Sequence, residues 1–120
     1  MTSTPSFTVR ICAWPDGAAG LRRIRYDVFV VEQRVPEALE WDAADTESIH
    51  ALATDAAGAP IGCARLLADG HIGRVAVVRD WRGHGVGTAL MLCLIDRARS
   101  RGDVFEEAGI AHRVMTRQLP

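Results

Sequence analysis

A glycine-rich stretch between an apolar run and a helical pattern is the part of this sequence best suited to bind a ligand. Residues 82–88 read RGHGVGT and follow the β-branched run at 75–78. A helical pattern begins directly afterwards, so unpaired backbone N–H groups and the positive end of the helix dipole would face this loop. Gly83, Gly85 and Gly87 allow close approach of the backbone and positive φ. The pattern predicts a cradle for phosphate oxygens.

The spacing of the glycines excludes two common nucleotide-binding loops. A P-loop ends in Gly-Lys followed by Ser or Thr, whereas this loop ends in Gly87-Thr88 without a lysine. The dinucleotide fingerprint requires G-x-G-x-x-G, and the order here is G-x-G-x-G. A pattern that does fit is R-x-x-G-x-G, from Arg82 to Gly87. The alternative is a glycine-rich turn between strand and helix that binds no ligand.

With the strand at 74–77 in front of it, this motif resembles the acetyl-CoA motif of the GNAT superfamily of N-acetyltransferases. Segments 28–33 (VFVVEQ) and 40–42 (EWD) also resemble one bacterial group within that family. The resemblance implies an α/β GNAT fold, with a mixed, mostly antiparallel central sheet flanked by helices, and acetyl-CoA as co-substrate. The positions that it assigns to coenzyme A are Val75, Ala76, Val77, Arg82, Gly83, His84, Gly85, Val86, Gly87 and Thr88.

Composition limits the remaining possibilities. The chain has 120 residues, 48% hydrophobic and 24% charged, which predicts a single domain over 1–120 that folds alone or as a small oligomer such as a homodimer. A formal net charge of −1 provides no basic field for nucleic acid, and no stretch reaches the length of a membrane span. The odd cysteines Cys12, Cys63 and Cys93 are expected to be buried free thiols of a reducing cytoplasm. The N-terminal residues do not resemble a signal peptide, and no metal site is expected.

Hydrophobic periodicity places the elements around the cradle. A turn is expected at 15–17, and Pro36 stops any continuation of the first helix. The expected elements are a half-buried strand at 7–13, an amphipathic helix at 18–33, two antiparallel strands at 50–54 and 61–67, a strand at 75–78 and a buried helix at 89–98.

The segment 32–47 is unusually acidic. Its only basic residue is Arg34, and its acidic residues are Glu32, Glu37, Glu40, Asp42, Asp45 and Glu47. A run of this kind most often forms a solvated loop. The functional alternative is a negative rim that attracts a cationic amine.

The sequence departs from the family's pattern after the helix at 89–98. Family members continue with a further strand and a helix that often carries a tyrosine acting as general acid. Here residues 101–103 lead directly into 104–115, which resembles the family's closing hairpin, and the only tyrosine is Tyr26. Three explanations are open: a segment absent from this sequence, a rearranged or swapped hairpin, or a truncated protein without activity.

The reaction itself suggests further site residues. An alkylammonium with a pKa of about 10.4 must lose a proton before its nitrogen can attack a thioester. The base candidates are Glu32, His71, Glu107 and His112, each of which also has a structural interpretation; Glu32 is favoured because the first helix meets the acidic segment there. The backbone N–H of Val77 is the expected donor to the oxyanion.

The function expected from these features is N-acetyl transfer from acetyl-CoA to a primary amine of a small molecule or protein. The alternative is a non-catalytic acyl-CoA-binding or oligomerising module with an incomplete site. Release of free thiol from acetyl-CoA in the presence of amines distinguishes the two.

Overall fold

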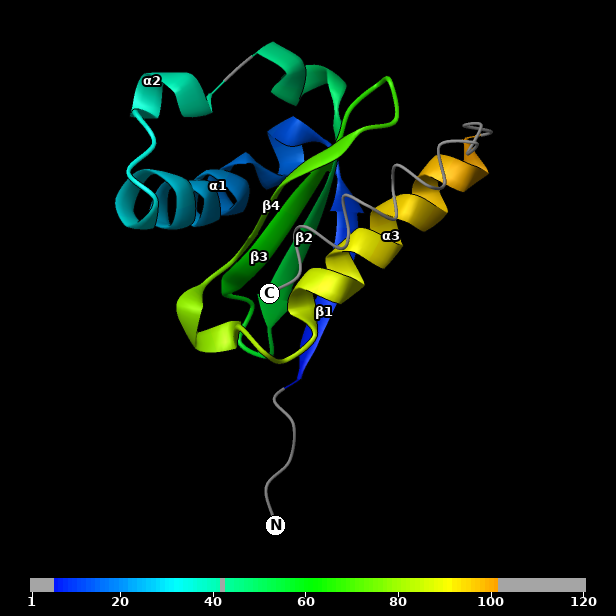
Figure 1. Ribbon diagram of the computed structural model, residues 1–120. Coiled ribbons are helices and arrows are strands. Elements are labelled where there is room, and N and C mark those ends of the chain that lie inside the picture. Colours follow the sequence, from blue (N-terminus) through cyan, green and yellow to red (C-terminus); the bar gives the residue numbers. More distant parts are fainter. Residues whose placement is uncertain (1–5, 42, 102–120) are drawn as a thin grey trace.

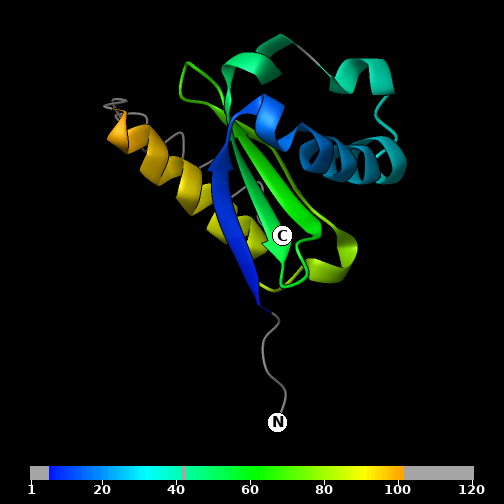
Figure 2. The same cartoon turned by 180° about the vertical axis from the view of Figure 1, so that it is seen from behind.

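The computed structural model describes residues 6–41 and 43–101, which form three layers. A four-stranded sheet lies in the middle, with one helix on each face (Figures 1 and 2). The strands are β1 (Phe7–Cys12), β2 (Ile49–Asp55), β3 (Pro60–Leu66) and β4 (Ile72–Val77). The helices are α1 (Trp14–Arg25), the π-helix η1 (Tyr26–Glu32), α2 (Glu37–Glu40), the 3₁₀-helices η2 (Ala43–Glu47) and η3 (Arg79–Trp81), and α3 (Val86–Ser100).

The sheet is an antiparallel meander in the order β1-β2-β3-β4, so the prediction of antiparallel neighbours is confirmed. The turn between β2 and β3 shows how local chemistry fixes the pairing. One carboxylate oxygen of Asp55 accepts hydrogen bonds from the backbone N–H groups of Ala57 and Ala59, both at 2.9 Å. Gly58 has φ +88°, a conformation that costs glycine little. The α/β class and the mostly antiparallel sheet agree with the expected fold.

The first helix begins earlier than the sequence predicts. The expected turn at 15–17 is wrong: these residues form the first turn of α1, which starts at Trp14. Pro15 is tolerated there because the first helical N–H groups have no partner within the helix, and Asp16 lies at the positive end of the dipole. The other end agrees with prediction, since η1 ends at Glu32 and Gln33 donates its N–H to the carbonyl of Val28 at 3.0 Å.

Helices α1 and α3 bury their apolar sides against opposite faces of the sheet. Leu90, Met91 and Leu94 of α3 are fully buried in one cluster, which confirms the expected buried helix, although α3 begins at Val86, three residues before the expected start at 89. Leu21 and Ile24 of α1 are fully buried in the other. The glycine-rich loop is therefore held between a packed strand and a packed helix.

The three cysteines are free thiols, but only two are buried. Burial raises the pKa of the Cys63 thiol to about 12, and burial also raises that of Cys12. Cys93 is partly exposed, which corrects the expectation that it is buried, because its position on α3 falls at the edge of the face covered by the sheet. No helix among the described residues has the length and hydropathy needed to cross a membrane. The expected closing hairpin at 104–115 lies outside the described residues.

Candidate functional site

A cleft of about 650 Å³ opens between β4, the loop that precedes α3, and the end of η1. Figure 1 shows the η1 end of the first helix and the loop before α3 on the same side of the molecule, beside β4. The residues that line the cleft are Val28, Glu32, Gln33, Val75, Ala76, Val77, Trp81, Arg82, Gly83, Gly85, Val86, Gly87 and Thr88. They include every position predicted to contact coenzyme A except His84.

His84 is exposed and its ring lies edge-on to Trp81, with the ring centroids 5.9 Å apart. Trp81, Val28 and Gln33 line the cleft although the sequence analysis did not select them. For Trp81 a signal existed, because a large aromatic side chain stands immediately before the motif. Val28 and Gln33 are the two ends of segment 28–33, which carried a family resemblance, but that resemblance did not indicate that they line the cleft.

The loop needs glycine at two positions because of its backbone conformation. Gly83 has φ +82° and Gly85 has φ +84°, both in the left-handed region. A Cβ atom added at either residue would meet no atom within 4 Å, so crowding is not the reason for the glycines. The space beyond them is open to a ligand, and a side chain at either position would carry backbone strain.

The N-terminus of α3 forms the floor of this loop. Gly85 is the N-cap residue, no side chain caps the helix, and the first turn carries no acidic residue. The bond from the Ala89 N–H to the Gly85 carbonyl, at 3.0 Å, closes the first helical turn. The N–H groups of Val86, Gly87 and Thr88 precede that turn and point to the open end of the helix. This donor set suits an anion such as a diphosphate.

Arg82 connects the loop to two other parts of the cleft. Its Nε donates to the carbonyl of Val77 at 2.9 Å, and its Nη2 donates to Glu32 Oε1 at 2.8 Å. Arg79 Nη2 lies 3.5 Å from the other carboxylate oxygen of Glu32. The hydrogen bond from Arg82 is the main reason why the pKa of Glu32 lies below its ordinary value. Glu32 is therefore ionised and tied to the loop.

Strand β4 carries a bulge next to the cleft. The register shifts between the pairs Cys63↔Ala76 and Arg65↔Gly73, over which β4 uses one residue more than β3. Arg74 lies within this bulge and has φ +50°. An extra residue of this kind bends a strand and redirects its backbone groups.

The backbone of Val77 faces away from β3. Val77 stands opposite Gly62, and the neighbouring Val78 N–H donates to the Ile61 carbonyl at 2.9 Å. This pattern makes Val77 and Gly62 a non-hydrogen-bonded pair, in which the N–H and C=O groups point outward. The Val77 carbonyl is accordingly free to accept from Arg82. The Val77 N–H points to the same edge of β4.

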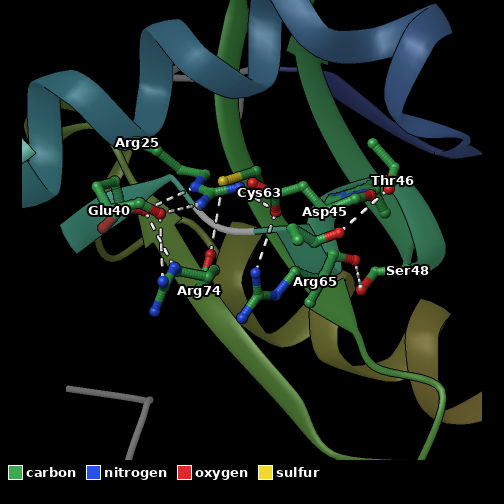
Figure 3. Close-up of polar contacts among 11 residues, drawn as sticks. Arg25, Glu40, Asp45, Thr46, Ser48, Cys63, Arg65 and Arg74 are labelled. Carbon is green, nitrogen blue, oxygen red and sulfur yellow. Dashed lines mark hydrogen bonds and ion pairs between the residues drawn. The ribbon is translucent and has the colours of Figure 1, made fainter. Parts of the chain in front are cut away.

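A buried ionic network, which the sequence analysis missed, holds the acidic segment against the bulge (Figure 3). Arg25 donates from Nε to Glu40 at 2.7 Å and from Nη1 to Asp45 at 2.8 Å. Arg65 Nη1 lies 3.1 Å from Asp45, and Arg74 Nε lies 3.1 Å from Glu40. Arg74 thereby connects this network to the bulge in β4.

The interpretation of 32–47 as a solvated loop is therefore wrong for two of its acids. Glu40 is 2% exposed and Asp45 is 3% exposed, whereas Glu37 and Glu47 are exposed. The reason is that their arginine partners come from α1, β3 and β4, which no local charge pattern reveals.

The other residues considered for catalysis lie elsewhere. His71 is exposed in the turn before β4, with Nδ1 3.0 Å from Asp69, and does not line the cleft. Tyr26 begins η1 and does not line it either. Glu107 and His112 lie outside the described residues. Of the base candidates, the structure brings Glu32 to the cleft.

These features define a layered α/β domain with a glycine-rich loop, at an uncapped helix N-terminus, set against a bulged strand. Residues 18–115 match the model of the acetyltransferase (GNAT) family, and the chain belongs to that family.

Solved structures agree with this assignment. A presumed N-acetyltransferase from Lactobacillus plantarum is 30% identical, with a TM-score of 0.72 over 82% of this chain and 70% of that one. An acyl-CoA N-acyltransferase from Pseudomonas aeruginosa is 29% identical, with a TM-score of 0.70 over 79% and 72%. A GNAT-family acetyltransferase from Staphylococcus aureus Mu50, 13% identical, shares the fold with a TM-score of 0.61 over 80% and 69%. Family and fold support acyl-CoA-dependent N-acyltransferase activity in general.

Proposed function

We propose that this protein transfers an acetyl group from acetyl-CoA to a primary amine of a small molecule or a protein. The observation that carries the proposal is one continuous cleft, lined by an uncapped helix N-terminus and by the outward-facing edge of β4. The helix N-terminus suits the diphosphate of coenzyme A. The edge of β4 offers backbone N–H and C=O groups to the pantetheine amides. The free thiols described above fit a reducing compartment such as the cytoplasm.

In this proposal the loop residues bind and β4 assists the reaction. The N–H groups of Val86, Gly87 and Thr88, together with Arg82, hold the diphosphate. Acetyl-CoA supplies the acetyl thioester when it is bound. The outward-facing N–H of Val77 donates to the thioester carbonyl oxygen as negative charge develops on it.

Glu32 is the group on this chain that we assign to remove the proton from the ammonium. The neutral nitrogen then forms a bond to the acetyl carbon, the carbon–sulfur bond breaks, and the thiolate leaves with the bonding electrons. A thiol has a pKa near 8.5, so the leaving group needs little protonation at neutral pH. The nitrogen loses its second proton to water or to the departing thiolate, and the products are an acetamide and the free thiol of coenzyme A.

Replacement of Gly85 by valine tests the cradle. The variant forces a β-branched residue to φ +84° and should reduce coenzyme A affinity about five- to thirtyfold, because the strain of about 1–2 kcal/mol is relieved by moving the loop. Gly58→Val is the matched control, since Gly58 has φ +88° and also faces open space, but lies in the β2–β3 turn. Calorimetric titration with coenzyme A gives both affinities.

Equal affinities of the two variants would contradict the cradle assignment. If the Gly85→Val protein does not fold, as judged by circular dichroism, Gly85→Ala provides the milder change. Release of free thiol from acetyl-CoA is then measured with a panel of amines and amino-terminal peptides. Binding of coenzyme A without release for any acceptor would favour a non-catalytic acyl-CoA-binding module over the enzyme.

A further inference from the structure

Glu32 is the only carboxylate among the described residues that line the cleft, and it stands beside the groups that would hold a diphosphate. Fifty residues of sequence separate it from Arg82, yet their side chains meet at 2.8 Å. Among the described residues, the structure shows Glu32 in ion pairs with Arg82 and Arg79. Both arginines belong to the segment that follows β4. The Glu32 carboxylate thus pairs with the same guanidinium groups to which an anionic ligand in the cleft would bind.

A diphosphate and a carboxylate cannot both accept hydrogen bonds from the same N–H groups of Arg82. A diphosphate in the cradle brings more negative charge than one carboxylate, and the two anions repel each other at short range. The existing ion pair is also easily exchanged, because the Arg82 side chain is 39% exposed and that of Glu32 is 24% exposed. Ion pairs in contact with water contribute little to stability.

We propose that the Glu32 carboxylate and the diphosphate of coenzyme A compete for Arg82, so that cofactor binding releases Glu32 to accept the proton of the amine. This inference rests on the proposed function and adds to it an order of events. Before coenzyme A binds, Glu32 is held by Arg82. Afterwards it is released from Arg82, keeps the longer contact with Arg79 at 3.5 Å, and faces the cleft at the end of η1.

The geometry allows this exchange without displacement of the loop. Arg82 Nε remains bonded to the Val77 carbonyl at 2.9 Å, which anchors the guanidinium next to β4. Only the Nη2 contact with Glu32 has to change. An arginine fork can hold the carbonyl through Nε and still present its other N–H groups to phosphate oxygens.

Calorimetric titration of coenzyme A into wild type and Glu32→Gln tests the competition. Because the wild-type diphosphate must displace the carboxylate, Glu32→Gln should bind coenzyme A about two- to fivefold more tightly. Asp27→Asn is the matched control: Asp27 lies on the same helix and pairs with Arg23 at 3.2 Å, away from the cleft, so its affinity should equal that of wild type. Pantetheine, which lacks the diphosphate, should show no gain with Glu32→Gln.

An unchanged or weaker affinity of Glu32→Gln, with normal binding by wild type, would overturn the competition and leave the proposed function standing. Weaker binding would mean that Glu32 orients Arg82 for the ligand. Absence of coenzyme A binding by wild type would overturn both.

A second measurement follows the carboxylate directly. Carbon-detected NMR titration of Glu32, assigned by comparison with Glu32→Gln, gives its pKa with and without coenzyme A. The pKa should rise when coenzyme A binds, because Arg82 no longer stabilises the ionised form and a diphosphate is nearby. A pKa that falls or does not change would show that Arg82 stays on Glu32.

Discussion

A single guanidinium joins the first helix to the acidic segment. Arg25 is 1% exposed and donates to the side chain and the carbonyl of Glu40, each at 2.7 Å, and to Asp45. The rings of Trp14 and Trp41 lie within reach of a cation–π contact, with their centroids 5.6 and 5.1 Å from the guanidinium carbon. Because water is excluded, the carboxylates of Glu40 and Asp45 would keep, among the described residues, only Arg74 and Arg65 as partners if Arg25 were removed.

Arg25→Ala should therefore be severely destabilising. It leaves the buried carboxylates of Glu40 and Asp45 without their main partner, which costs about 3–5 kcal/mol in the free energy of unfolding. Urea denaturation measures the loss. Arg23→Ala, which removes an exposed ion pair with Asp27, serves as control and should cost less than about 1 kcal/mol. Similar losses in the two variants would show that the buried network contributes little.

At the scale of elements, the position of the cradle depends on the close approach of α3 to β3. A Cβ atom added at Gly62 would lie 2.9 Å from Val86 Cγ1 and 3.1 Å from Leu90 Cδ1. Val86 is the first residue of α3 and also lines the cleft. The absence of a side chain at Gly62 thus sets the distance between the sheet and the N-terminus that would hold the ligand.

Gly62→Ala should push this end of α3 outward. Overpacking of this kind costs about 1–3 kcal/mol, and we expect both a lower melting temperature and weaker coenzyme A binding. Gly73→Ala is the control, because a Cβ at Gly73 on β4 would meet no atom within 4 Å. Thermal unfolding and titration with coenzyme A provide the two readouts. A Gly62→Ala protein as stable as Gly73→Ala would mean that α3 adjusts freely.

At the scale of the whole molecule, two buried groups make stability depend on pH. Burial lowers the pKa of His50, whose Nε2 donates to the Asp45 carbonyl at 2.9 Å. Burial alone would raise the pKa of Asp45, but its hydrogen bonds and charge interactions with Arg25 and Arg65 outweigh burial and lower it. Both groups therefore bind protons more readily in the unfolded chain than in the folded protein.

Because both pKa values are lowered by folding, stability should decrease as the pH falls. The contribution of His50 is fully present above its ordinary value of 6.5 and is lost as the pH drops toward its folded value. The slope is at most about 1.4 kcal/mol per pH unit for one group, and Asp45 adds to it below an ordinary value of 3.8. Free energies of unfolding measured between pH 7.5 and 4.5 give the contribution of His50.

His50→Asn should flatten this dependence between pH 6.5 and 4.5, even if it lowers stability overall. The exposed His71 provides the control, since His71→Asn should retain the wild-type slope. An unchanged slope in His50→Asn would assign the acid sensitivity to other groups.

The sequence by itself determined the four strands, the buried helix α3, the glycine-rich loop before it and the family. These features depend on local patterns: alternation in the strands, apolar spacing in α3, and glycines that must take positive φ at Gly83 and Gly85. Residues 82–88 lie at the N-terminus of α3 because they directly precede and begin that helix in the sequence. For this reason the cleft contains nearly all of the positions selected from the motif.

Only the tertiary structure decided which charges are buried and which meet. The burial of Glu40 and Asp45 depends on arginines from distant elements, and the contact between Glu32 and Arg82 joins residues far apart in sequence. The start of α1 at Trp14 is also decided by the tertiary structure, because a Pro-Asp-Gly sequence suits a turn and a first helical turn equally well. The sequence shows the sign of the net charge of a segment. Which residues form ion pairs with that segment depends on how the sheet and the helices pack.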